Sequence, residues 1–296
     1  MSLIASCSDD QSIIIWNSNT SEILHILHGH NKCVESVCFS SDNNLLVSAS
    51  YDRTVRVWDL ETGKCKNILY GHEDRVILAV FSFDNSKILS LSQYREVRLW
   101  DIETGYCLKI IDFVEYINVS FSHDFSKIVL TTDNEQIKIY DVKSGEIINT
   151  LIGHNKFIKS VLFNHDNSQI ISCTKETIII WDVESGEMIR NLSIDNDHNM
   201  SNVSLNHDST LLASGFYDGT ILIRSLENGE IVNTLIFDVE YINSFSFNFD
   251  SSLLIASGDN VKIYDVKSGE CIETLDEHDS KVNSAIFSKI ETGSYL

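Results

Sequence analysis

Short apolar runs, each bounded by polar turn residues, follow one another along the whole chain. Within the first clear example, such runs occupy residues 34–39, 45–49, 54–58 and 65–69, with Asp, Asn, Ser and Gly between them. Val, Ile, Thr and aromatic residues that alternate with polar ones at period two predict β-strands. The apolar spacing of a helix is not sustained anywhere in the sequence, so the pattern predicts an all-β fold.

This group of four runs repeats at a nearly constant interval. The residue that ends the third run has equivalents 40 to 43 residues apart, at Trp16, Trp58, Trp100, Tyr140, Trp181, Arg224 and Tyr264. A turn of the form Asp-x-x-Thr/Ser-Gly follows most of them, at Gly63, Gly105, Gly145, Gly186 and Gly269, with Asn228-Gly229 as a variant. Glycine in the left-handed region after a type I turn closes such a hairpin. The repeat therefore predicts units of four antiparallel strands.

The units must pack on one another, because a four-stranded sheet cannot cover both of its faces. A closed ring leaves only short, protected edges, whereas a linear stack leaves its end faces exposed. The chain opens with Leu3–Ser6, which matches a second run, and ends with Lys281–Phe287, which matches a first run. We expect the last strand to complete the opening unit and give seven units. A fragment of a longer array is the alternative.

Two signatures accompany the repeat: Gly-His pairs at His30, His72 and His154, and Trp-Asp pairs such as Trp58-Asp59. With them, the chain from Leu3 to Phe287 resembles the WD40 β-propeller family. The resemblance implies an all-β, seven-bladed WD40-like β-propeller with four antiparallel strands per blade and a first blade closed by the C-terminal strand. Residues 1–296 are predicted to form a single domain, with blades at about 1–28 plus 279–296, 29–70, 71–112, 113–152, 153–194, 195–236 and 237–278.

The resemblance also implies a hydrogen-bonded network within a blade, from the indole through a hydroxyl and an imidazole to a carboxylate. Its residues in the second blade are His30, Ser48, Asp52 and Trp58, and in the first blade His278, Ser6, Asp10 and Trp16. Indole donates, hydroxyl donates and accepts, and neutral imidazole does both, so the chain is chemically consistent. A hydrolytic triad occurs once and needs an exposed nucleophile, whereas this set is periodic, which indicates a structural role.

Five blades depart from the full network. The third has Tyr94 and the fifth Lys175 where the Asp is expected, and the sixth has Arg224 in place of Trp. The fourth and seventh use Tyr140 and Tyr264 and lack the Gly-His pair. These blades are expected to depend more on apolar packing.

Composition narrows the classes of function. The chain has 43 Asp and Glu against 22 Lys and Arg, a net charge of −21. Such a field repels nucleic acid and anionic lipid and favours basic partners, unless it serves solubility alone. Neither an apolar run of membrane-spanning length nor a signal peptide is evident. The seven cysteines show no C-x-x-C spacing and are expected to be reduced, so we expect an intracellular protein of the cytoplasm or nucleus.

No cofactor or metal is expected. His25, His28 and His30 are closely spaced, but His30 already has a structural role and no Cys or carboxylate set accompanies the others. His123, His165 and His207 recur before the Asp of a first turn and are expected to be turn residues. Phosphate-binding glycine motifs are absent from the sequence.

The resemblance implies that partners dock on one face of the propeller. On this face, the turn between the second and third strands of a blade lies beside the loop that connects its fourth strand to the first strand of the next blade. The residues predicted for this top face are Tyr51, Arg75, Tyr94, Tyr116, Phe157, Tyr217, Tyr241 and Lys281. Exposed aromatic residues on a concave rim suit a peptide-binding hot spot, and Asp9 and Glu115 nearby favour a basic segment.

The sequence thus predicts a non-catalytic protein-interaction scaffold, not an enzyme, that binds basic peptide segments on the top face and channel rim. It is expected to be a monomeric propeller within larger complexes, without direct contact with nucleic acid or membrane. One alternative is an adaptor subunit of a chromatin, ubiquitin-ligase or signalling complex that uses its side surfaces. A propeller enzyme is the less favoured alternative, because no acid/base pair stands out from the repeats.

Overall fold

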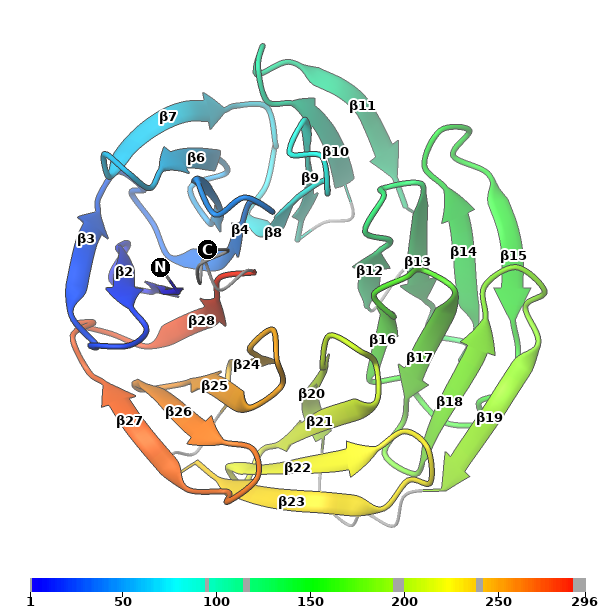
Figure 1. Ribbon diagram of the computed structural model, residues 1–296. Coiled ribbons are helices and arrows are strands. Elements are labelled where there is room, and N and C mark those ends of the chain that lie inside the picture. The colour runs from blue at the N-terminus through cyan, green and yellow to red at the C-terminus, as the bar shows by residue number, and fades with distance from the viewer. Residues whose placement is uncertain (1, 94–95, 114–117, 194–199, 238–241, 290–296) are drawn as a thin grey trace, which may run out of the picture. The chain divides into compact units, whose positions relative to one another are not determined.

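A computed structural model shows seven four-stranded antiparallel sheets built from strands β1 to β28 (Figure 1). The structure describes residues 2–93, 96–113, 118–193, 200–237 and 242–289. Within these residues there is no helix, and therefore no helix long and apolar enough to cross a membrane. The fold class predicted from the repeat, all-β with seven four-stranded blades, is confirmed.

The chain separates into two compact units, Met1–Asp112 with Asn243–Leu296 (unit 1) and Phe113–Ile242 (unit 2). Unit 1 holds four blades: β28 (Val282–Phe287), β1 (Leu3–Ser8), β2 (Ile13–Asn17) and β3 (Ile23–Leu27); β4 (Val34–Phe39), β5 (Leu45–Ser50), β6 (Val55–Asp59) and β7 (Lys64–Leu69); β8 (Val76–Phe81), β9 (Lys87–Ser92), β10 (Glu96–Asp101) and β11 (Cys107–Asp112); and β24 (Ser244–Phe247), β25 (Leu253–Ser257), β26 (Val261–Asp265) and β27 (Cys271–Leu275).

Unit 2 holds the remaining three blades. They are β12 (Val119–Phe121), β13 (Lys127–Thr131), β14 (Ile137–Asp141) and β15 (Ile147–Leu151); β16 (Ser160–Phe163), β17 (Gln169–Cys173), β18 (Thr177–Asp182) and β19 (Met188–Ser193); and β20 (Met200–Leu205), β21 (Leu211–Phe216), β22 (Thr220–Ser225) and β23 (Ile231–Ile236). The assignment of residues 1–296 to a single domain, with its blade limits, stays a prediction.

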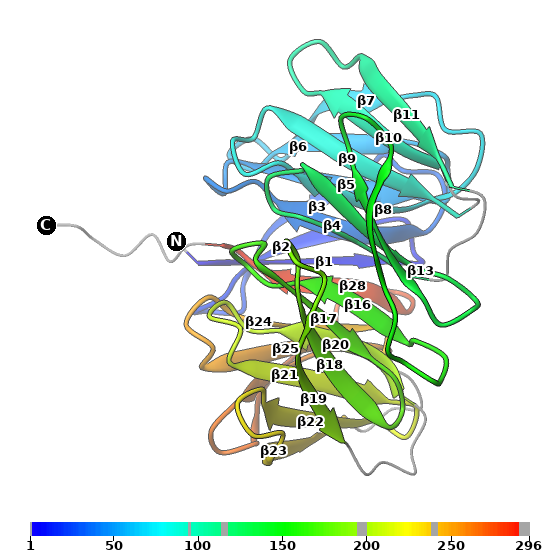
Figure 2. The same cartoon turned by 90° about the vertical axis from the view of Figure 1, so that its right-hand side faces the viewer.

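The first blade takes its innermost strand from the C-terminal part of the chain, as predicted. β28 lies antiparallel beside β1, with Ala5 opposite Ile286 (Figures 1 and 2). The Ser288 amide donates to the Leu3 carbonyl at 2.8 Å, and the Leu3 amide donates to Ser288 Oγ at 2.9 Å. These bonds join residues that are almost the full length of the chain apart.

The core lies between neighbouring blades of each unit. In unit 1, Trp58 of the second blade packs in one cluster with Ala5, Ile13 and Ile15 of the first. In unit 2, Trp181 of the fifth blade belongs to one cluster with Ile139 of the fourth. Each sheet therefore covers the face that its neighbour leaves open, which is the burial that a lone four-stranded sheet cannot achieve.

The turn between the third and fourth strands follows from its sequence. In the second blade, Asp59 Oδ1 accepts from the Thr62 amide at 2.8 Å, and the Gly63 amide donates to the Asp59 carbonyl at 2.9 Å. Gly63 has a φ of 67°, in the left-handed region where a side chain is unfavourable. The Asp-x-x-Thr/Ser-Gly pattern thus encodes the position of the outermost strand.

Candidate docking face and structural network

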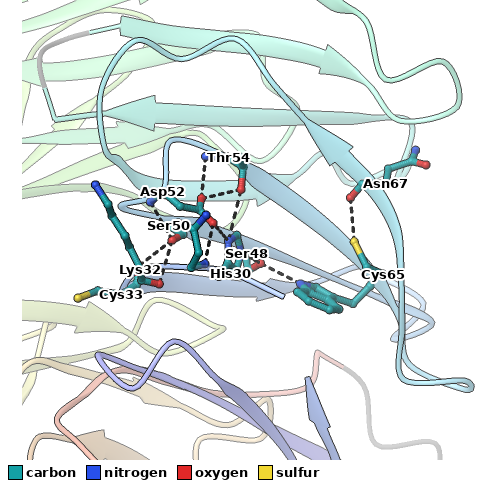
Figure 3. Close-up of polar contacts among 11 residues, drawn as sticks. His30, Lys32, Cys33, Ser48, Ser50, Asp52, Thr54, Cys65 and Asn67 are labelled. Atoms are coloured by element: carbon teal, nitrogen blue, oxygen red, sulfur yellow. Dashed lines mark hydrogen bonds and ion pairs between the residues drawn. The ribbon is translucent and has the colours of Figure 1, made fainter. Parts of the chain in front are cut away.

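The second blade contains a continuous hydrogen-bonded chain. Trp58 Nε1 donates to Ser48 Oγ at 2.8 Å, and Ser48 Oγ lies 2.8 Å from His30 Nε2 (Figure 3). His30 Nδ1 lies 2.8 Å from Asp52 Oδ2 (Figure 3). The indole can only donate, so the pattern closes when Ser48 donates to Nε2 and Nδ1–H donates to the carboxylate.

The first blade contains the same chain, assembled from both ends of the sequence. Trp16 Nε1 donates to Ser6 Oγ at 3.0 Å, and Ser6 Oγ lies 2.8 Å from His278 Nε2. His278 Nδ1 lies 2.9 Å from Asp10 Oδ2. This network therefore joins the N-terminal hairpin to the segment that precedes β28.

The third blade has a carboxylate that the sequence comparison of blades missed. Glu96, the first residue of β10, places Oε1 2.6 Å from His72 Nδ1, while Trp100 and His72 both reach Ser90 Oγ. The longer side chain of Glu96 thus brings a carboxylate to the imidazole from two residues beyond position 94, but His72 Nδ1 forms no hydrogen bond within the part of the chain that the structure describes, so the network remains incomplete as predicted. Glu96 also accepts from Arg98 Nε at 2.6 Å.

The fifth and sixth blades keep the departures seen in the sequence. In the fifth, His154 and Trp181 both bond to Ser172 Oγ, and Thr177 Oγ1 lies 3.3 Å from His154 Nδ1. In the sixth, Arg224 is buried at the tryptophan position and donates from Nη1 to the Gly229 carbonyl at 3.3 Å. A hydroxyl thus stands in for the carboxylate of the fifth blade, whereas the buried Ser214 Oγ of the sixth blade has no hydrogen-bond partner among the described residues.

Burial fixes the charge states of these networks. It lowers the pKa of the His72 and His154 imidazoles to about 4 in each case, although Glu96 opposes the shift at His72. Burial acts to raise the pKa of Asp52, but hydrogen bonds from His30 and Thr54 outweigh it and hold the pKa well below its ordinary value. A neutral imidazole beside an ionised carboxylate is the state that the hydrogen bonds require.

The serines of these networks are closed to an external substrate. Ser6, Ser48, Ser90 and Ser172 are each 0% exposed. A nucleophilic serine must be accessible to its substrate, so these buried His-Ser sets are consistent with a structural role in the blades that contain them.

Two of the predicted top-face residues of unit 1 lie against each other. The Arg75 guanidinium lies 4.9 Å from the centre of the Tyr51 ring, and the Glu35 carboxylate is close enough to Tyr51 to perturb its pKa. Burial and Glu35 raise the pKa of Tyr51 to about 12. Burial, with a contribution from Asp9, raises the pKa of Glu35. We call Asp9, Glu35, Tyr51 and Arg75 the acidic-aromatic cluster.

The sequence did not single out Glu35. It lies in β4, the innermost strand of its blade, where the pairing with β5 shifts between Val34 and Ser36. The shift inserts an extra residue at this point and leaves Glu35 half-buried between buried neighbours. A β-bulge cannot be read from apolar alternation, although a charged residue within an otherwise apolar inner strand is the signal that could have marked it.

The other predicted top-face residues are spread among the blades. Lys281 is exposed, and its carbonyl accepts from the Asp9 amide at 3.0 Å. In unit 2, Phe157 is exposed with Lys159 Nζ 5.3 Å from its ring centre, and Tyr217 is exposed beside the β21–β22 turn. Tyr94, Tyr116 and Tyr241 lie outside the described residues.

The histidines expected in first turns form a row in unit 2. The ring centres of His123 and His165 are 4.6 Å apart, and those of His165 and His207 are 4.0 Å apart. Among the described residues, no group of three His, Cys, Asp or Glu is arranged to hold a metal ion. All seven cysteines are free thiols.

Seven four-stranded blades with buried Trp-Ser-His networks define the class of WD-repeat propellers. The model of the WD domain, G-beta repeat family matches residues 1–17, 21–59, 63–101, 145–182 and 187–225, more than half of the chain. The chain therefore belongs to the WD40-repeat family. No curated protein matches it. WD40 propellers are generally protein-interaction scaffolds and typically not enzymes.

Proposed function

We propose that this protein is a non-catalytic docking platform that binds basic segments of partner proteins through the acidic-aromatic cluster of unit 1. The observation that carries the proposal is the arrangement of Tyr51. The Arg75 guanidinium lies 4.9 Å from the centre of its ring, and the Glu35 carboxylate is close enough to contribute to the raised pKa of its hydroxyl. An aromatic side chain that is held in place beside carboxylates suits a cationic side chain of a partner.

The charge balance of the cluster supports the same choice of partner. Burial, with a contribution from the charge of Asp9, disfavours ionisation of Glu35 and raises its pKa. A lysine or arginine from a partner would relieve this repulsion and favour ionised Glu35. The net charge of −21 would speed the approach of a basic segment.

Location and assembly are part of the proposal. The free state of all seven cysteines supports a reducing compartment, the cytoplasm or nucleus. We propose that the chain acts as a monomer within larger complexes and has no direct contact with nucleic acid or membrane, since its negative field disfavours both.

Fluorescence anisotropy with a labelled peptide rich in Arg and Lys tests the proposal. Tyr51→Ala and Glu35→Gln should each weaken binding by about tenfold, the equivalent of about 1.4 kcal/mol. The matched control is Tyr106→Ala, since Tyr106 is exposed in the β10–β11 turn at the opposite end of its blade. Equal losses in the control, or unchanged binding in both cluster variants, would contradict the proposal. Phe157→Ala and Tyr217→Ala measure separately what unit 2 contributes.

A further inference from the structure

Exposed apolar side chains of the described residues concentrate on the fourth strands of the blades. Most of the large hydrophobic residues that are exposed lie in β3, β11, β15, β19, β23 or β27. Each of these strands is the last in its sheet and has a neighbouring strand on one side only. Single exposed apolar residues need no explanation, but a recurring set on one kind of strand does.

In unit 2, the fourth strand of every blade begins with two exposed apolar residues. The pairs are Ile147-Ile148, Met188-Ile189 and Ile231-Val232, and their side chains are 42% to 54% exposed. The pairing register shifts within each pair and leaves Ile148, Ile189 and Val232 as the extra residue of a β-bulge. A bulge interrupts the alternation of faces, which allows both members of each pair to be exposed.

An exposed glutamate stands directly before each apolar pair. These residues are Glu146, Glu187 and Glu230, and Glu184 and Glu227 add exposed carboxylates in the turns of the fifth and sixth blades. The aspartates of the turns are bonded internally, as Asp182 accepts from the Ser185 amide at 2.7 Å. Each of the three blades therefore presents an exposed glutamate directly beside an exposed apolar pair.

Contacts connect the neighbouring blades near these exposed residues. Arg190 of β19 donates from Nη1 to the Leu226 carbonyl at 2.9 Å, and so ties the fifth blade to the turn of the sixth. A side chain added at Gly186 would meet Asn149 of β15, so the turn of the fifth blade lies against the fourth. We call Ile147, Ile148, Met188, Ile189, Ile231 and Val232, with Glu146, Glu187 and Glu230, the outer strip of unit 2.

The backbone of the outer strip indicates how a partner would bind. The Thr150 amide donates to Asn149 Oδ1 at 2.8 Å, and the Thr234 amide donates to Asn233 Oδ1 at 2.8 Å. Because each of these edge amides already donates to a side chain, it is less available to pair with an added strand. Contact through side chains is thus favoured over extension of the sheet.

We propose that the outer strip of unit 2 binds a segment of another protein in which aliphatic residues alternate with Lys or Arg. The aliphatic residues would cover the apolar pairs, and the basic residues would meet the intervening glutamates. Charge complementarity selects this occupant over a second copy of the chain, because two molecules of charge −21 repel each other. The site is separate from the acidic-aromatic cluster and does not depend on it.

The test uses the full chain and a labelled synthetic peptide in which pairs of leucine and lysine alternate, with fluorescence anisotropy as the readout. Ile189→Ser and Val232→Ser should each weaken binding at least fivefold, and Glu187→Gln with Glu230→Gln should weaken it more at low than at high salt. The matched control is Leu108→Ser, because Leu108 of β11 is 53% exposed but follows Tyr106 and Cys107 rather than a glutamate. Tyr51→Ala should leave the affinity for this peptide unchanged.

Three results would overturn the proposal. The first is an affinity within twofold of wild type in both Ile189→Ser and Val232→Ser. The second is an equal loss in Leu108→Ser, which would show unspecific apolar contact. The third is sedimentation of the wild type as a dimer that Val232→Ser dissociates, which would assign the outer strip to a second copy. A melting transition like that of the wild type shows that each variant is folded.

Discussion

Ser48 illustrates how one small side chain connects two large ones. Its hydroxyl accepts from the Trp58 indole and lies in hydrogen-bond contact with His30, and all three residues are buried. A hydroxyl is the only neutral group of this size that can both donate and accept a hydrogen bond. The serine is therefore required by the chemistry of its neighbours rather than by the fold alone.

Ser48→Ala should lower the free energy of unfolding by about 1–3 kcal/mol, since it leaves a buried indole N–H and a buried imidazole nitrogen without their partner. Urea denaturation measures the loss. Ser193→Ala in β19 is the control, because Ser193 is exposed. Equal midpoints for Ser48→Ala and wild type would show that the network contributes nothing to stability.

The buried histidines predict how stability depends on pH. Burial lowers the pKa of His154 from its ordinary value of 6.5 to about 4. The neutral form is thus favoured in the folded state, and its contribution is fully present above pH 6.5. As pH falls from 6.5 towards 4, the unfolded chain binds a proton that the folded chain does not, so stability is lost.

His154→Gln should therefore reduce the loss of stability between pH 6.5 and pH 4, even though it destabilises the protein at neutral pH. Unfolding in urea across this range measures the slope. A steeper slope in the variant would contradict the lowered pKa of His154. His207→Gln serves as the control in a half-exposed turn.

At the scale of strands and turns, the order of elements was predictable and some of their contacts were not. Apolar alternation places β4 to β7 of the second blade, and the Asp59-to-Gly63 turn positions β7. The contact of Glu96 with His72 depends on the reach of a side chain from a neighbouring position, which alignment of blades cannot reveal. The place of Glu35 depends on a local shift of register.

The residues proposed to form a docking face were likewise only partly predictable from the sequence. Tyr51 and Arg75 come from two consecutive blades and lie against each other. The sequence placed both residues on the same face but could not predict that they would be in contact. For Lys175, the sequence predicted only that the fifth blade has no carboxylate at this position. In the structure its Nζ lies 3.7 Å from Glu176, away from the network of the fifth blade.

Glu96→Ala tests the carboxylate of the third blade. It should lower the free energy of unfolding by about 1–3 kcal/mol, because a half-buried carboxylate that holds His72 and Arg98 is removed. Glu96→Gln should lose less, since the amide oxygen can still accept. Thermal melts compare both with Glu61→Ala, whose side chain is exposed in the β6–β7 turn. A loss no larger than that of Glu61→Ala would leave Glu96 without a structural role.

At the scale of the whole molecule, the acidic charge connects both proposed sites. A net charge of −21 attracts basic segments to the acidic-aromatic cluster and to the outer strip alike. The association rate of either peptide should fall steeply as salt rises to physiological strength, while the dissociation rate changes less. Stopped-flow fluorescence measures both rates. An association rate that does not respond to salt would rule out steering by the field.

The pairing of distant chain segments makes the first blade a single structure. β28 supplies the innermost strand of that blade, and its Val282, Ala285 and Phe287 are buried. His278 bonds to Asp10 and Ser6 from the segment just before it. Asn283 of β28 also donates to Asp9 at 2.8 Å, so this closure helps to position one residue of the proposed acidic-aromatic cluster.

The most direct measurement compares the unfolding of the full chain with that of a chain ending at His278, and with a control shortened only by residues 290–296. Loss of β28 should cost roughly 3 kcal/mol or more, from the buried valine and phenylalanine alone, and should expose the amides of β1 to hydrogen exchange. The control should melt as the full chain does. A chain ending at His278 that unfolds at the same denaturant concentration, with β1 still protected, would contradict the account.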